Sequence, residues 1–241
     1  MNRILASIRN DITIQFRAKL YAIGIGVGLL VAIIIAFIFK PEHLSIIVPS
    51  FILLVIGGST MLYVAGLIVI ERDEGTINTI LVSPLKISEY LWSKIITLSG
   101  LATLESILMI GGATLILSLS NEVILPNIAL LLLGIIAIGI IYTLIGIILI
   151  VRYEKITEFL IPLAAVAMIL QAPVLYFLGL MKYRVFLIIP TSAPTMLMQG
   201  AYIQLSLIEW LYAFGYTSVV IVVLAFWADR AFKKHLAMGV M

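Results

Sequence analysis

Acidic and basic side chains gather in one stretch of the sequence, Glu71 to Lys94 (ERDEGTINTILVSPLKISEYLWSK), which lies between two long apolar runs. Its acids precede Gly75, and the helix dipole favours negative charge at the start of a helix. Apolar residues follow at helical spacing and Pro84 ends the pattern, which predicts a short amphipathic helix, with Ser88 capping the next one. The residues that carry this prediction are Glu71, Glu74, Gly75, Thr76, Ile77, Ile80, Leu81 and Pro84. Such a helix is suited to contact with another protein.

The sequence motifs of the common enzyme classes are missing. No Gly-Lys dipeptide occurs, so the chain has no G-x-x-x-x-G-K-[ST] loop with which to bind nucleotide phosphates. There is no cysteine, and the two histidines, His43 and His235, are predicted on opposite sides of a membrane. That separation excludes a paired-histidine metal site and a Ser–His dyad. We therefore expect no catalytic residue, no metal ligand and no cofactor bound by this chain.

The composition is that of an integral membrane protein. Of the 241 residues, 63% are hydrophobic and 11% are charged, whereas soluble domains are about half apolar and a quarter charged. Mean hydropathy is +1.24. Six apolar runs are long enough to cross a bilayer: residues 20–39, 46–70, 95–119, 128–151, 159–181 and 210–227. We predict one all-α membrane domain, residues 1–241, with six transmembrane helices.

The basic residues set the expected orientation in the membrane. With six spans both termini lie on one side, together with the Glu71–Lys94 stretch, and 12 of the 15 Lys and Arg residues fall there. The other side has Lys40, Lys182 and Arg184. Because basic loops stay in the cytoplasm, we expect a multi-pass protein of the cell membrane with both termini cytoplasmic. The basic balance is assigned to topology, so no nucleic-acid partner is expected.

The first 19 residues form an amphipathic segment. Apolar side chains at helical spacing lie on one face, and basic side chains surround the rest of the helix. The apolar residues are Ile4, Leu5, Ile8, Ile12 and Phe16. Two interpretations stay open: an interfacial helix that lies on membrane lipid with its cations toward anionic headgroups, or an ordinary positive flank ahead of the first span.

Two polar residues lie within the predicted spans. Glu105 is in the third span, where an ionisable side chain is costly unless it faces protein or water. It either lines a substrate path or is a hydrogen-bonded structural residue. Gln171 is in the fifth span, close to Pro162 and Pro173, which predict a kinked or broken helix.

The stretch between the fifth and sixth spans, residues 182–209, is too short for two more crossings and too apolar for a plain loop. We predict one or two helices that dip back into the outer interface. Pro190 and Pro194 interrupt this stretch and are candidates for shaping an outer gate.

The Glu71–Lys94 stretch resembles the cytoplasmic coupling segment of ABC transporter permeases of the type-2 exporter class. The matching residues are Glu71, Glu74, Gly75, Thr76, Ser83, Pro84, Ser93 and Lys94. The run from Leu187 to Pro194 resembles the outer segment of that family's small drug-export members, including the fluoroquinolone-export type.

This resemblance implies a permease that exports drug-like or lipid-like hydrophobic or amphipathic molecules, as in multidrug efflux. It also implies re-entrant outer helices and a dimer with a second permease chain, identical or different. Two copies of a separate ATP-binding subunit, which hold the ATP and Mg, would grip the coupling helix and the N-terminal helix.

Other functions remain open on the sequence alone. A secondary transporter or channel without an ATPase partner would use ionisable residues near the membrane midplane, where Glu105 is the one candidate. A membrane enzyme or assembly factor would need a constellation of polar residues in the spans. A purely solvated Glu71–Lys94 loop would have no coupling role.

Overall fold

The computed structural model describes residues 3–75, 86–119, 122–123, 125–153 and 156–238. All regular structure in these residues is helical, and six of the helices are long and apolar enough to cross a membrane. The predicted all-α fold with six spans is therefore confirmed. The coupling-helix residues Thr76, Ile77, Ile80, Leu81 and Pro84 lie outside the described residues.

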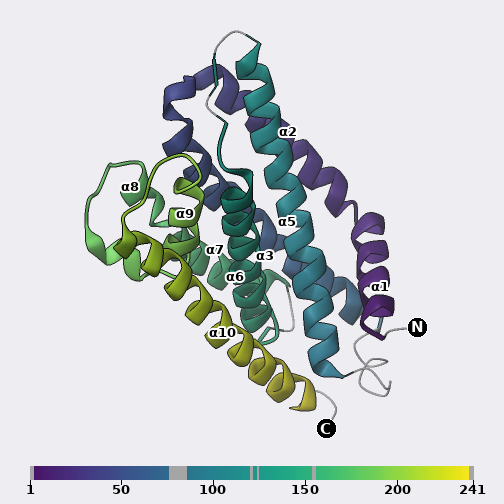
Figure 1. Ribbon diagram of the computed structural model, residues 1–241. Coiled ribbons are helices and arrows are strands. Elements are labelled where there is room, and N and C mark those ends of the chain that lie inside the picture. Colours follow the sequence, from purple (N-terminus) through teal and green to yellow (C-terminus); the bar gives the residue numbers. More distant parts are fainter. Residues whose placement is uncertain (1–2, 76–85, 120–121, 124, 154–155, 239–241) are drawn as a thin grey trace.

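Helices of very different length make up the chain (Figure 1). The long ones alternate in direction, and short helical pieces connect two pairs of them. The bounds are α1 Arg3–Arg17, α2 Leu20–Ile38, η1 Pro41–His43, α3 Leu44–Asp73, α5 Ile87–Ser118, α6 Ile128–Ile150, α7 Ile156–Gln171, α8 Val174–Phe177, η2 Arg184–Ile188, α9 Ser192–Gln199 and α10 Leu207–Met238.

Helix α6 stands in the centre of the bundle and packs against α3, α5, α9 and α10 (Figure 1). Helix α2 runs along the far side of α5, and α1 lies beside the end of α5 that is nearest the chain's N-terminus. Helices α2, α7 and α10 are the least buried of the six candidate spans. Much of their surface is therefore apolar side chain that lipid or another chain can cover.

Glycines let these helices approach closely, as is common between membrane helices. A Cβ atom added at Gly57 of α3 would lie 2.4 Å from the Tyr142 ring of α6. One at Gly134 of α6 would lie 2.3 Å from Met198 Cγ of α9. One at Gly28 of α2 would lie 2.9 Å from the backbone oxygen of Glu105 in α5. The close approach of α3 and α9 to α6, and of α2 to α5, thus depends on glycine.

Two local predictions for the Glu71–Lys94 stretch are wrong. Glu71 and Asp73 do not begin a new helix, because α3 continues through them to Asp73. Ser88 does not cap α5, which already begins at Ile87. The Glu89 side chain takes the capping role instead, since its Oε2 accepts a 2.8 Å hydrogen bond from the backbone N–H of Lys86. Both helices therefore extend beyond the ends of the apolar runs, α3 to Asp73 and α5 from Ile87.

The fifth span is interrupted, and the break is at one of the two prolines. Pro162 lies inside α7 without ending it, whereas α7 ends at Gln171, just ahead of Pro173. A short helix, α8, follows from Val174 to Phe177. Proline cannot supply the backbone N–H that would continue α7.

Candidate functional site

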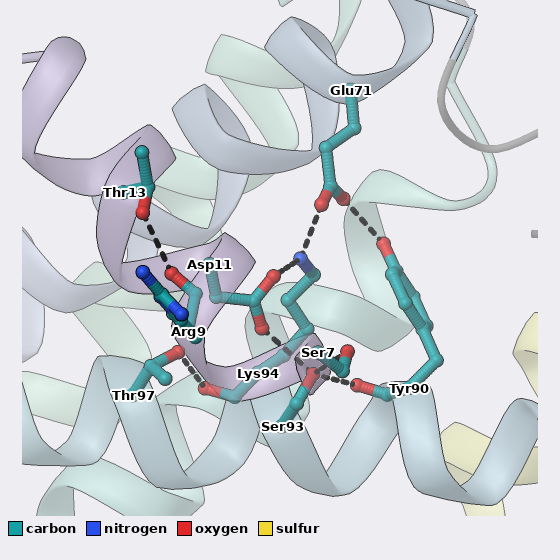
Figure 2. Close-up of polar contacts among 9 residues, drawn as sticks. All are labelled: Ser7, Arg9, Asp11, Thr13, Glu71, Tyr90, Ser93, Lys94 and Thr97. Atoms are coloured by element: carbon teal, nitrogen blue, oxygen red, sulfur yellow. Dashed lines mark hydrogen bonds and ion pairs between the residues drawn. The ribbon is translucent and has the colours of Figure 1, made fainter. Parts of the chain in front are cut away.

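A buried ionic cluster joins three helices at one end of the bundle (Figure 2). The Lys94 ammonium of α5 forms ion pairs with Asp11 Oδ1 of α1 and Glu71 Oε1 of α3. The Tyr90 hydroxyl donates a 2.6 Å hydrogen bond to Glu71 Oε2. The Ser93 hydroxyl donates one of 2.7 Å to Asp11 Oδ2. We call Asp11, Glu71, Tyr90, Ser93 and Lys94 the Lys94 cluster.

Spacing along α5 and the packing of α1 and α3 against it bring these side chains together. Tyr90, Ser93 and Lys94 are three and four residues apart, so they lie on one face of α5. Glu71 reaches this face from the last turn of α3, and Asp11 reaches it from the middle of α1. Both ion-paired carboxylates and the ammonium have side chains that are 1% exposed. The cluster is therefore internal to the chain.

Charge within the Lys94 cluster is unbalanced, because two carboxylates share one ammonium. Burial raises the pKa of Asp11 above its ordinary value, and the neighbouring Lys94 opposes that rise. Buried charges are tolerated only when they are paired and hydrogen-bonded. Removal of Lys94 would thus leave two buried carboxylates without a cation, which makes it the residue on which the other members depend.

Arg72, the residue after Glu71, binds α3 to the end of α6. The Arg72 guanidinium donates a 3.2 Å hydrogen bond to the backbone oxygen of Ile150 and a second bond to that of Tyr153. These carbonyls are at the C-terminal end of α6, where the helix dipole favours a cation. Glu71 thus joins the last turn of α3 to Lys94 of α5, which in turn binds α1. Arg72 joins the same turn to α6.

The chain leaves α3 through a tight turn. Gly75 has a φ of 68°, in the left-handed region that glycine adopts without strain. Glu74, with a side chain that is 43% exposed, lies 4.0 Å from the Arg17 guanidinium. Such an exposed pair contributes little to stability. The structure therefore places Glu74 near the surface and Glu71 inside, although the sequence groups them together.

Glu105 lies apart from the Lys94 cluster, in the interior between α2, α3 and α5. Its Oε2 accepts hydrogen bonds from the hydroxyls of Ser59, at 3.1 Å, and Tyr63, at 3.2 Å. Its Oε1 is buried without a partner in the part of the chain that the structure describes. A Cβ atom on Gly24 would lie 3.6 Å from Oε2, so α2 covers the carboxyl group closely. These contacts favour the structural interpretation of Glu105.

Gln171 does not join Glu105. It ends α7, and its side-chain amide donates a 3.1 Å hydrogen bond to the backbone oxygen of Leu54 in α3. Besides the bonds of Glu71, helix α3 therefore makes polar contacts to α5 through Ser59 and Tyr63, and one to the broken fifth span at Leu54.

The predicted outer segment is hydrogen-bonded to two helices, α7 and α10. Pro190 precedes α9, and Pro194 lies in the first turn of α9, where proline is tolerated. The Thr191 hydroxyl donates a 2.5 Å hydrogen bond to the backbone oxygen of Leu170 in α7. The Tyr212 hydroxyl of α10 donates one of 2.5 Å to that of Leu187. The gate role of the two prolines stays a prediction.

Comparison with known proteins settles the family. The model of the fluoroquinolones export permease protein family matches residues 2–239. The chain belongs to this permease family. The fluoroquinolones export permease proteins of two Mycobacterium tuberculosis strains, CDC 1551 and ATCC 25618, are each 28% identical to it over 239 residues. The matches cover 97% of this chain and 94% of each relative.

Family membership confirms the predicted drug-export permease, and the type-2 ABC exporter class agrees with it. The six candidate spans support a multi-pass membrane protein. Sequence reasoning missed Asp11 and Tyr90 as partners of Lys94. One signal was available for Asp11, the single acid among the basic residues of the N-terminal segment.

Proposed function

We propose that this permease exports fluoroquinolones or similar amphipathic drugs and that a separate ATP-binding subunit drives it from the cytoplasm. Two such subunits and a second permease chain would complete the transporter, with ATP and Mg held by the subunits. The family and the names of the relatives support the cargo. The Lys94 cluster, at the base of the segment that follows α3, supports the mode of driving.

The coupling role follows from the way Glu71 and Arg72 connect the end of α3 to other helices. A push on the residues after Gly75 acts first on the last turn of α3. The ion pair of Glu71 with Lys94 would transmit the displacement of α3 to α5, and the ion pair of Lys94 with Asp11 would transmit it to α1. The hydrogen bond of Arg72 would transmit the displacement to α6. A buried charge that loses its partner is strongly unfavourable, so these helices move together rather than separate.

This arrangement changes the expected roles of the two glutamates. Glu71 is a positioning residue that fixes α3 to α5, because its carboxylate is buried within the permease. Glu74 is the acid that remains accessible to an ATP-binding subunit. A surface carboxylate at the start of a connecting segment can attract a basic patch on a partner.

The test is drug uptake by inverted membrane vesicles that contain the permease and its ATP-binding subunit. ATP should drive accumulation of a fluorescent fluoroquinolone, and a non-hydrolysable ATP analogue should not. Glu74→Lys should lower drug-stimulated ATP hydrolysis several-fold with normal membrane insertion. The matched control Glu42→Lys reverses another exposed acid, on the predicted outer side, and should leave hydrolysis unchanged.

The alternative, a secondary transporter, makes the opposite prediction. The purified permease alone, in vesicles with an imposed proton gradient and no ATP, would then accumulate the drug. That result, or co-purification from native membranes without any ATP-binding chain, would overturn the proposed coupling.

A further inference from the structure

Helix α10 packs against the bundle along one side. In Figure 1 it runs from the outer segment, beside α8 and α9, to the end of the bundle where both chain termini lie. Buried residues recur three or four positions apart, which places them on one side of the helix. They are Ala213, Thr217, Val220, Leu224, Ala228 and Phe232. Over these 19 residues the buried stripe extends about 29 Å, so contacts on one helix join both ends of the bundle.

The last residue of the stripe contacts the Lys94 cluster. The Phe232 ring lies against the Tyr90 ring, with centroids 5.0 Å apart, and Phe232 is 3% exposed. Tyr90 also holds both charges of the cluster. Its hydroxyl donates to Glu71, and the Lys94 ammonium lies over its ring, 4.6 Å from the centroid. Helix α10 is therefore a fourth helix at the cluster, and Phe232 fixes the ring on which these contacts depend.

The other end of α10 is bound to the outer segment. The Tyr212 hydroxyl donates to the backbone oxygen of Leu187, and the Tyr216 hydroxyl donates to that of Ile188. The two tyrosine rings stack on each other, with centroids 5.4 Å apart. Next to Tyr212, Ala213 packs in a small apolar cluster with residues of α8 and α9, apart from the main core. The outer segment thus has its own set of contacts with α10.

We propose that α10 transmits a movement of the Lys94 cluster to the outer segment. Phe232 is its positioning residue at the predicted cytoplasmic end, and Tyr212 is the one at the outer end. This role rests on the proposed ATP-driven export, because that function supplies the movement. Coupling between distant sites is carried by packed side chains and rigid helices. Helix α10 has both, since ring contacts and hydrogen bonds hold its ends and a buried stripe joins them.

The test is hydrogen–deuterium exchange of the purified full-length permease in nanodiscs, read at residues 184–199 of the outer segment. Phe232→Leu keeps an apolar side chain but removes the ring that contacts Tyr90. It should raise exchange at residues 184–199 several-fold, because a loosened α10 makes local opening less costly. The matched control Phe226→Leu makes the same change on the outer side of α10, where Phe226 is 68% exposed, and should leave exchange unchanged.

Unchanged exchange in Phe232→Leu, or an equal rise in Phe226→Leu, would overturn the proposal. A second variant tests the link from the outer end. Tyr212→Phe removes only the hydroxyl that binds Leu187. Because coupling between two sites is reciprocal, it should raise exchange at residues 87–94, which include Tyr90 and Lys94. The control Tyr183→Phe removes an exposed hydroxyl and should not. Unchanged exchange at residues 87–94 in Tyr212→Phe would contradict the link.

Drug transport distinguishes transmission from a purely structural role. In the vesicle assay with the ATP-binding subunit, Phe232→Leu should keep its ATP hydrolysis but move several-fold less drug per ATP. Phe226→Leu should match the unmodified permease. A proportional loss of hydrolysis and transport would overturn the role of Phe232 in transmission. Absence of ATP-driven uptake by the unmodified permease would instead refute the proposed function, whereas the exchange measurements use no ATP and still decide the link.

Discussion

Glu71 and Glu105 are equally buried glutamates in neighbouring helices, and they are stabilised in different ways. Glu71, at the end of α3, binds the Lys94 ammonium and the Tyr90 hydroxyl. Glu105, in the middle of α5, has only the hydroxyls of Ser59 and Tyr63. No cation pairs with Glu105 anywhere in the described chain.

The difference follows the position of each residue along the bundle. A paired charge is tolerated near the headgroup region, where one ionic cluster can join the ends of several helices. Deeper in the bilayer, hydroxyl groups are the cheaper partners, because an added cation would itself require desolvation. The first site is thus suited to transmit force, whereas the second fixes the contact of α2, α3 and α5.

The largest effect should come from Lys94→Met. The change leaves the buried carboxylates of Asp11 and Glu71 without their cation, and we expect a loss of about 3–5 kcal/mol in the free energy of unfolding. Thermal unfolding of the purified permease measures it. The control Lys233→Met breaks an exposed pair with Asp229 and should cost less than about 1 kcal/mol. Equal stability of the two variants would disprove the dependence on Lys94.

An intermediate effect is expected at Glu105, where two substitutions distinguish its possible roles. Glu105→Leu leaves the Tyr63 hydroxyl without an acceptor and should cost about 1–3 kcal/mol, whereas Glu105→Gln keeps an acceptor oxygen and should be nearly neutral. Thermal unfolding and drug transport are measured together. A stable Glu105→Gln variant that no longer transports drug would favour the substrate-path role over the structural one.

The smallest effect should come from glycines of α2. Gly28→Ala places a methyl group 2.9 Å from the Glu105 backbone oxygen, so α2 must shift away from α5. The cost of overpacking, about 1–3 kcal/mol, is partly offset by alanine's better helix propensity. Gly26→Ala is the control, since its Cβ would meet nothing within 4 Å. Similar unfolding temperatures for the two variants would show that α2 can shift away from α5 at little cost in stability.

The long apolar runs made the six spans and the all-α fold predictable, because a bilayer requires helices of that length. The internal position of Glu71 was not predictable from local pattern. Its partner Lys94 is 23 residues away, and Asp11 is 83 residues from Lys94. Only the packing of α1, α3 and α5 brings them together. Likewise, nothing near Gly57 in the sequence indicates that it makes room for the Tyr142 ring.

The same separation along the chain bears on how the protein is made. Asp11 leaves the ribosome long before Lys94, so this carboxylate has no ionic partner while the first two spans insert. The buried side of α1 stays hydrated until the beginning of α5 arrives, and only then can the three helix ends close on each other. A nascent chain that stops short of Lys94 would therefore present an unsatisfied carboxylate to quality-control proteases.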